Sequence, residues 1–443
     1  WVGAGDAHQA WNNANGDTAA FGAGGTAGTV TVDPGGIAIG GLLFNAVASG
    51  TYTLVGGPLT LMGAPVFTAN TNAAVNAALA GAAGFAKAGA ATLALGSKES
   101  TFAGDIAIQQ GTLAASANNT QSAAPTNSAL GYLLSPRTVA VGSGGTLLFG
   151  ANDVLGNAGA APSLVINVKS GGTVRNSNTF NVLGPLNLEG GALTTQGGVL
   201  SGYQAFQFRG AVTAGGDAAI NTLGGALNGV HLGNNLFAVT SGALTVSAPL
   251  INSAGGSTAG FTKSGTGLMV LAADNSFGGA VTVSNGTLQV GAGGAAGTLG
   301  TGASAVSRVN ADARLLFSRA GFVGHAGAIS GAGSLVKDGE SVLTLSGANS
   351  YAGNTLISNG VLAVTTTNAL PGYAEPGRVT LEDGAALSVG VGSWTTGDIS
   401  ALIGLGVFGP GTGFGFDTTA GNFTYSGQFA LPSVAGAENT SST

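Results

Sequence analysis

An internal repeat restricts the fold of this chain more than any other feature of its sequence. The segment Gly260–Val290 aligns without a gap with Ser334–Val364, and Lys263 of the first segment matches Lys337 of the second. A third copy, Phe85–Ala115, follows the same pattern after one inserted residue. Repeats of this kind are typical of architectures in which each unit stacks on its neighbours, because one unit cannot bury its apolar face alone.

A shorter unit recurs outside the three copies. An apolar-x-apolar triplet is followed by two to four residues that include glycine and then by a second triplet, as in Val30–Val32 before Ile37–Ile39 and Phe237–Val239 before Leu244–Val246. Alternation with a period of two places one face of a short strand inward. No helical periodicity accompanies these triplets, so helical crossovers between strands are not expected.

Stacked coils are the arrangement that buries strands this short. Each coil pairs its backbone with the coils before and after it, while inward Val, Ile, Leu and Phe side chains fill a continuous core. The sequence therefore predicts an all-β fold, a right-handed parallel β-helix (β-solenoid) of roughly 20 coils with about 20 to 25 residues each. We expect residues 1–27 to form an N-terminal capping segment, 28–403 the solenoid, and 404–443 a C-terminal cap or strand-exchange tail.

Composition excludes several other classes of protein. Only 7% of the 443 residues are charged, against about 25% in ordinary soluble domains, while 44% are hydrophobic and the net charge is −6. A chain so rich in apolar residues is not expected to be disordered. Every apolar stretch is interrupted within a few residues, which predicts no membrane-spanning helix. The lack of a basic cluster argues against a nucleic-acid partner.

The residues of the long repeat resemble the autotransporter-associated β-strand repeat, which occurs in the passenger regions of bacterial autotransporters and related large secreted proteins. The match is nearly complete over Leu335–Val364, close over Phe261–Val290 and weaker over Phe85–Leu113. The resemblance implies a β-helix that is secreted, extracellular or at the cell surface of a Gram-negative-type bacterium. It leaves the function open, because members of this family include adhesins and biofilm components.

The two ends of the sequence lead to further expectations. Because the chain starts at Trp1 without a charged and then apolar leader, we interpret it as a mature secreted product whose signal peptide has been removed, or as a trimmed chain. The residues after Gly390 are too few for the translocator barrel of an autotransporter. We favour a free-standing secreted protein over one whose barrel has been cleaved.

Candidates for catalysis, metal binding or cofactor binding are few. The closest acidic groupings are Asp338 with Glu340 and the pair Glu382 and Asp383, all within expected turns, and the chain has no cysteine. The three histidines are far apart and lack metal-ligand spacing: His8, His231 and His325. We therefore predict no catalytic, metal-binding or cofactor-binding residues and no enzymatic activity.

Two residue types recur at fixed positions of all three copies. Three lysines are expected at one corner of the coil, with the stem along the apolar wall and the ammonium in water: Lys87, Lys263 and Lys337. Three aromatic residues are expected to complete the core of their coils, with stacking on sugar rings as the alternative: Phe102, Phe277 and Tyr351. Both sets are therefore interpreted first as structural.

The ends of a solenoid expose unpaired strand edges and need a cap or a partner. An alternating run near the C-terminus could add a strand to a neighbouring sheet, and aromatic residues at both ends are candidates for assembly: Trp1, Trp11, Phe423, Tyr425 and Phe429. We hypothesise an extracellular structural protein, a self-assembling fibre or matrix subunit that forms a head-to-tail homopolymer. The alternative is an autotransporter-type adhesin passenger at the cell surface, with a cell-surface or matrix polysaccharide as a further partner. The second alternative is a polysaccharide-active β-helix enzyme.

Overall fold

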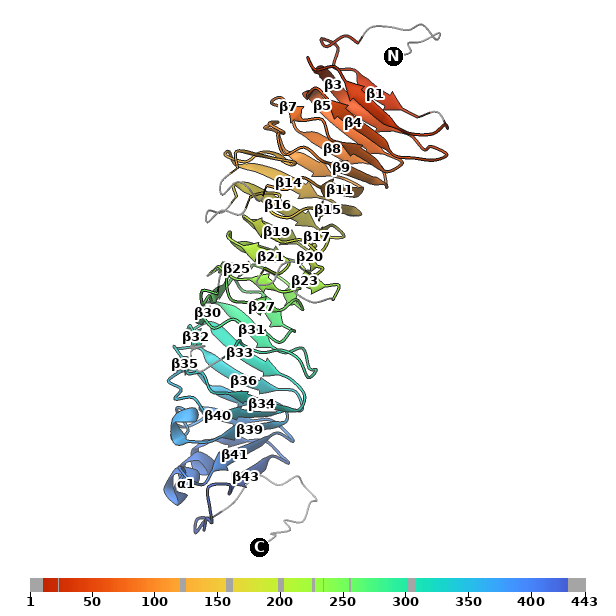
Figure 1. Cartoon of the computed structure of the whole chain (residues 1–443). Coiled ribbons are helices and arrows are strands. Elements are labelled where there is room, and N and C mark those ends of the chain that lie inside the picture. The colour runs from red at the N-terminus through yellow and green to blue at the C-terminus, as the bar shows by residue number, and fades with distance from the viewer. Residues whose placement is uncertain are drawn as a thin grey trace. The chain divides into compact units, whose positions relative to one another are not determined.

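The computed structural model describes residues 11–22, 24–119, 125–156, 162–197, 203–224, 228–233, 235–254, 256–301 and 307–428. The chain folds as a parallel β-solenoid of about 16 turns with almost no helix, which confirms the predicted all-β class (Figure 1). It divides into two compact units, unit 1 (Trp1–His231) and unit 2 (Leu232–Thr443).

Unit 1 is built from short parallel strands on three faces. The first face holds β1 (Thr18–Phe21), β3 (Ile37–Phe44), β5 (Leu59–Ala69), β8 (Phe85–Ala88), β10 (Ile106–Ile108), β14 (Arg137–Val141), β16 (Leu164–Lys169), β19 (Leu186–Glu189) and β22 (Val212–Gly215). The second holds β2 (Thr29–Val32), β4 (Tyr52–Gly56), β6 (Ala73–Val75), β9 (Thr92–Leu95), β11 (Gly111–Ala115), β15 (Gly145–Phe149), β17 (Thr173–Asn176), β20 (Ala192–Thr195) and β23 (Ala218–Thr222). The third holds β18 (Asn181–Leu183), β21 (Phe206–Phe208) and β24 (Val230–His231).

The core of unit 1 consists of apolar columns that run from turn to turn. Leu93, Leu113, Leu147 and Val174 occupy one register position on β9, β11, β15 and β17, and all four are 0% exposed. Neighbouring strands lie about 4.8 Å apart, so each side chain packs on the one above and the one below. The alternation in the sequence therefore defines which face of each strand is buried.

The number of turns is a correction, since about 16 turns replace the roughly 20 that the sequence predicts. Ile106 lies beside Phe85 and beside Val139, so successive turns take 21 and 33 residues. The longer turn carries the antiparallel pair β12 (Asn127–Ser128) and β13 (Gly131–Tyr132), and β7 (Leu79–Ala80) is a further short strand beside β5. Long connections of this kind use residues without adding turns.

Unit 2 has the same architecture. Its first face holds β25 (Asn235–Val239), β28 (Phe261–Ser264), β30 (Val281–Val283), β32 (Ser307–Val309) and β35 (Ile329–Ser330). Its second face holds β26 (Ala243–Val246), β29 (Leu268–Leu271), β31 (Gly286–Val290), β33 (Ala313–Ser318), β36 (Ser334–Asp338), β38 (Thr355–Ile357), β40 (Val379–Leu381) and β42 (Val407–Phe408). The third face holds β34 (Phe322–His325), β37 (Val342–Leu345), β39 (Val361–Val364), β41 (Ala386–Gly390) and β43 (Gly413–Asp417), and a short strand β27 (Leu250–Ile251) precedes β28.

The two repeat copies of unit 2 lie on different faces. The copy that begins at Phe261 opens with β28 on the first face, where Phe261 pairs with Val281. The copy that begins at Leu335 opens with β36 on the second face, where Leu335 pairs with Leu315. Between them the chain adds β34, the first strand of the third face. The later copy is therefore rotated by one face relative to the earlier copy.

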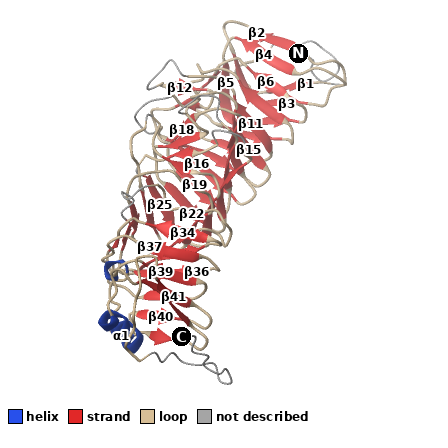
Figure 2. Cartoon of the chain, turned by 60° about the horizontal axis from the view of Figure 1, so that its bottom comes forward, coloured by secondary structure: helices blue, strands red, loops and turns tan. Residues whose placement is uncertain are grey.

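One helix departs from the sequence prediction, which included no helical segment. The helix α1 (Thr396–Leu405) begins with a capping box, because the Thr395 hydroxyl accepts from the Asp398 backbone and the Asp398 carboxylate accepts from the Thr395 N–H. A single turn of 3-10 helix, η1 (Thr367–Ala369), also occurs, and Figure 2 shows how little helix the chain contains. Neither of them, nor any other helix of the described ranges, is long and apolar enough to cross a membrane.

The strands extend into both predicted end segments. Within residues 1–27, β1 pairs in parallel with β3. Within residues 404–443, β43 pairs in parallel with β41. The boundaries at residues 27 and 403 remain predictions.

Candidate functional site

The most regular polar feature is a buried lysine at one corner of each repeat. Lys263 faces inward from β28 and is 0% exposed. Its Nζ donates to the carbonyl oxygens of Gly265 at 2.6 Å, Asn285 at 2.8 Å and Gly267. We call this arrangement of one ammonium and three carbonyls a lysine cradle.

Both other copies contain the same cradle. Lys87 donates to the carbonyls of Ala88 at 2.9 Å, Gly89 at 2.7 Å and Gln110 at 2.9 Å. Lys337 donates to those of Asp338 at 3.0 Å, Gly339 at 2.7 Å and Asn359 at 2.9 Å. The prediction that these ammonium groups lie in water is therefore wrong. The corner directs three backbone carbonyls inward, and they satisfy all three donors of the ammonium.

Glycine is required where the next turn passes the cradle. Gly286 has a φ of +68°, and a Cβ there would lie 2.4 Å from Nζ of Lys263. Gly360, with the same φ, would place a Cβ 2.9 Å from Nζ of Lys337. A side chain at either position would push against the ammonium in a backbone conformation that L residues rarely adopt.

The electrostatics of the cradles indicate a structural role. Burial lowers the pKa of each lysine to about 8, and no other cause lowers it. The groups therefore remain charged at neutral pH, held by carbonyl dipoles. None of the ion pairs found among the described residues involves these lysines. A fully buried cation without an open side has no surface on which to bind a substrate.

The recurring aromatic residues complete the core, as predicted. Phe102 and Phe277 are 0% exposed and Tyr351 is 1% exposed. The Phe102 ring lies 5.6 Å from that of Phe85, and the Phe277 ring lies 5.5 Å from that of Phe261. Because no ring face is open, stacking on a sugar ring is excluded at these three positions.

Two arginines beside these aromatic positions were not singled out from the sequence. Arg137 lies over the Phe102 ring at 4.7 Å and donates to the Phe102 carbonyl at 2.7 Å. Arg378 donates to the Gly353 carbonyl at 2.9 Å, close to Tyr351. Each arginine ties its turn to the turn before it. Neither belongs to the 31-residue repeat, so the repeat pattern offered no signal for them.

Within the described ranges no three of the acidic residues and histidines come together in a group that could hold a metal ion. Asp338 is hydrogen-bonded to the hydroxyls of Ser318 and Ser358. His231 accepts a hydrogen bond from the Gln204 backbone N–H at 3.1 Å. The third histidine named from the sequence, His8, lies outside the described residues.

His325 is buried in the core of unit 2. It is 9% exposed, its Nε2 has no hydrogen-bond partner, and its ring lies 5.5 Å from that of Phe317. Burial lowers its pKa to about 4. The residues that follow it at the same register position are Leu345, Val364 and Val389.

We expect acid to destabilise the chain through His325. Between about pH 4 and 6.5 the unfolded chain binds more protons at this residue than the folded chain, so the free energy of unfolding falls as the pH falls through this window. Replacement by leucine, His325→Leu, removes this loss. The difference in the free energy of unfolding between the variant and wild type, measured by urea denaturation, is expected to be about 2.5 kcal/mol more favourable to the variant at pH 4.5 than at pH 7.5. An equal difference at both pH values would show that His325 titrates normally.

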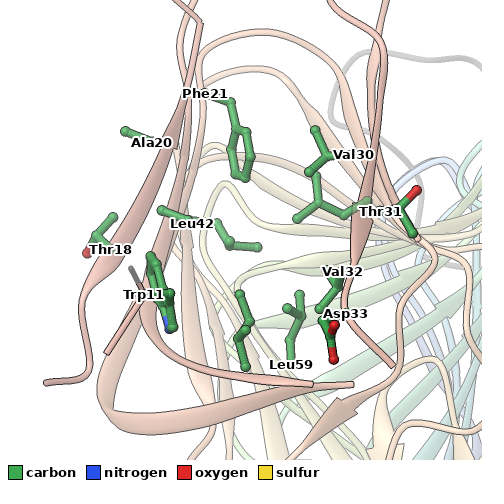
Figure 3. Close-up of a pocket in the computed structure, with 13 residues that line it drawn as sticks. Trp11, Thr18, Ala20, Phe21, Val30, Thr31, Val32, Asp33, Leu42 and Leu59 are labelled. Carbon is green, nitrogen blue, oxygen red and sulfur yellow. The ribbon is translucent and has the colours of Figure 1, made fainter. Parts of the chain in front are cut away.

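A cavity of about 720 Å³ opens in unit 1 between the first strands of two faces. Figure 3 shows Phe21, Val30 and Leu59 around this space, with Trp11 at its side. The Trp11 indole N–H donates to the Ala38 carbonyl at 2.9 Å. The lining is mainly apolar, as expected for the core of a solenoid beside its first described turn.

The other assembly candidates lie near the C-terminus or outside the described residues. The rings of Phe423 and Tyr425 lie 5.7 and 6.0 Å from that of Phe416, on β43 of the same chain. Tyr425 also exchanges a hydrogen bond with Ser400 on α1 at 3.1 Å. Trp1 and Phe429 are not among the described residues. A role of any of these residues in assembly remains a prediction.

Comparison with known proteins identifies the repeats. Three segments match the passenger-associated-transport-repeat family: residues 85–115, 261–290 and 335–364. These segments are the three copies that contain the lysine cradles. The chain thus carries passenger-associated repeats, as the sequence resemblance implies.

One curated relative is named as an adhesin. The adhesin BmaC autotransporter of Brucella suis biovar 1 (strain 1330) is 28% identical over 416 residues, which cover 77% of this chain and 12% of that relative. The chain therefore spans only a small part of the length of this relative. No solved structure matches the chain. The repeats and the relative indicate a surface or secreted location in Gram-negative bacteria.

Proposed function

We propose that this chain is an adhesive section of an autotransporter-type passenger, displayed at the surface of a Gram-negative bacterium. The observation that carries this proposal is the similarity to an adhesin along 77% of the chain, and the three passenger-associated repeats support it independently. The alternative in our sequence analysis is therefore better supported than the self-assembling fibre. Nothing in the comparisons favours the fibre, a polysaccharide partner or a polysaccharide-active enzyme.

The outer faces of unit 1 are suited to contact with a broad surface. Thr92, Thr112, Thr146 and Thr173 form one outward column on the second face, with one threonine on each of four successive turns. All four are partly exposed. A column of hydroxyl and methyl groups repeats every 4.8 Å or so along the stacked turns. Many weak, uncharged contacts at a regular spacing favour adhesion over the recognition of a single small molecule.

Surface display is the direct test of adhesion. The chain would be fused to an autotransporter translocator barrel and produced in a non-adherent Gram-negative laboratory strain. We expect several-fold more bacteria to bind to cultured epithelial monolayers than with an unrelated passenger of equal length. Protease accessibility on intact cells verifies display. Displayed chain without increased binding would contradict the proposal, and long filaments of purified chain in electron micrographs would favour the fibre instead.

A further inference from the structure

An open strand edge lies on the third face of unit 2. The strand β34 pairs with β37 on one side and is the terminal strand of its sheet in the described part of the chain. The last backbone hydrogen bonds between this segment and the preceding turn are Gly293 N–H to Ser318 and Ala320 N–H to Gly294, both 2.9 Å. The chain then leaves the preceding turn before β34 begins.

The unused backbone groups of β34 point away from β37. Val342 N–H donates to the Gly321 carbonyl at 2.9 Å, and Ser346 N–H donates to the His325 carbonyl at 3.1 Å. In a parallel ladder alternate residues bond to opposite sides. The N–H and C=O groups of Phe322 and Gly324 therefore face the open side, where only another extended backbone satisfies them in series.

Apolar side chains accompany this edge. Phe322 is 89% exposed, the largest value among the exposed large hydrophobic residues of the described ranges. Val323 faces the core in register with the buried Leu343, yet it is partly exposed, and none of the described strands lies before it in this sheet. No neighbouring atom lies within 4 Å of a Cβ built on Gly324. The edge thus presents the Phe322 ring on its outer face, the partly exposed Val323 side chain on its inner face, and unoccupied space beside Gly324.

A cation marks the beginning of the same edge. Arg319 is partly exposed and donates through Nη2 to the Ala295 carbonyl of the preceding turn, while its Nε is buried without a partner. None of the ion pairs of the described residues includes Arg319. Charge complementarity therefore favours a carboxylate at the end of the bound strand that reaches Arg319.

We propose that β34 is a binding site for an extended, acidic segment of another protein, which adds to the sheet as a strand. The segment presents one apolar side chain to Phe322, the next to Val323, and a carboxylate to Arg319. Main-chain hydrogen bonds supply affinity and the alternating side chains supply selectivity. This site is independent of whether the passenger as a whole is adhesive.

Peptide binding to the purified chain tests this site. The probe is a fluorescent synthetic peptide of one aspartate, four valines and two threonines in that order, so that consecutive valines can face Phe322 and Val323. Its binding is measured by fluorescence anisotropy. Phe322→Ser is expected to weaken binding about tenfold or more, because a buried large apolar contact is lost. The control Val361→Ser alters the same outer column on β39, which is paired on both sides, and should leave binding unchanged.

Two further variants separate the backbone and charge contributions. Gly324→Pro removes an edge-facing N–H without removing a bond to β37, so it should abolish peptide binding while the melting temperature remains close to wild type. Arg319→Gln should weaken binding of the aspartate peptide several-fold. It should leave unchanged the binding of a peptide in which asparagine replaces the aspartate.

Three outcomes would overturn the proposal. They are a wild-type chain that does not bind the peptide, equal binding by Phe322→Ser and Val361→Ser, and a wild-type dimer that Phe322→Ser converts to a monomer. The last outcome would assign the edge to a second copy of the chain. Because the assay uses purified chain and no cells, its result is separate from the adhesion test.

Discussion

Replacing Lys263 by methionine is expected to lower the free energy of unfolding by roughly 3 to 5 kcal/mol. Methionine fills a similar volume but donates no hydrogen bond, so the carbonyls of Gly265, Gly267 and Asn285 lose their donor inside a closed corner. A buried polar group left without a partner costs about 1 to 3 kcal/mol. Urea denaturation followed by far-ultraviolet circular dichroism measures the change.

Lys98→Met is the matched control for this variant. The Lys98 side chain is 50% exposed and its ion pair with Glu99 spans 3.9 Å on the surface. We expect its loss to change stability by less than about 1 kcal/mol. Similar destabilisation by Lys98→Met and Lys263→Met would show that water replaces the buried ammonium and that the cradle contributes little. Lys337→Met should behave like Lys263→Met, because its ammonium also donates to three backbone carbonyls, two of them at equivalent positions of the repeat.

Leu345→Asp is expected to unfold the turns around β37. Leu345 is 0% exposed and stacks between His325 and Val364 in the core. A carboxylate in this position costs several kcal/mol, because it loses its hydration among apolar side chains and the neighbouring His325 ring offsets only part of this cost. Hydrogen exchange measured by mass spectrometry should show loss of protection over β37 and β39.

The neighbouring residue provides the control. Thr344→Asp places the same carboxylate one residue earlier, on the outward face of β37, and should leave exchange protection nearly unchanged. If both aspartate variants behave alike, side-chain direction on β37 does not govern stability, and the register of this strand is wrong.

Much of the architecture could be predicted, because period-two alternation and a gap-free repeat both arise from side chains that point inward and stack on one another from turn to turn. Leu93 and Leu113 are examples, since each occupies the expected inward position and is fully buried. The number of turns could not be predicted, because connections such as that between Ile106 and Val139 have no fixed length. The helix α1 had a local signal, the Thr395 and Asp398 capping box, but the glycines within it obscured the helical pattern.

The candidate site was harder to predict than the fold. A lysine that recurs in a repeat can place its ammonium either in water or inside a corner of the coil. Which of the two occurs depends on whether backbone carbonyls from distant parts of the sequence meet at that corner. For Lys263 one acceptor, Asn285, lies 22 residues away in the sequence. The open edge of β34 depends on where the other described strands lie, since none of them precedes it in its sheet, and no residue of β34 itself indicates this. The aromatic positions were predictable because large apolar residues are usually buried.

The rotated repeat in unit 2 has a consequence for how such a chain lengthens. Backbone pairing between turns is similar on each face. Insertion of a single strand and corner, here β34, therefore moves every later residue onto the next face. The pairing of strands between turns continues across the insertion, from β33 to β36. Two sequence-identical epitopes separated by such an insertion would then point in different directions. A duplicated repeat in such a solenoid therefore changes the direction of its outer residues in discrete steps, whenever a single strand and corner is inserted between the copies.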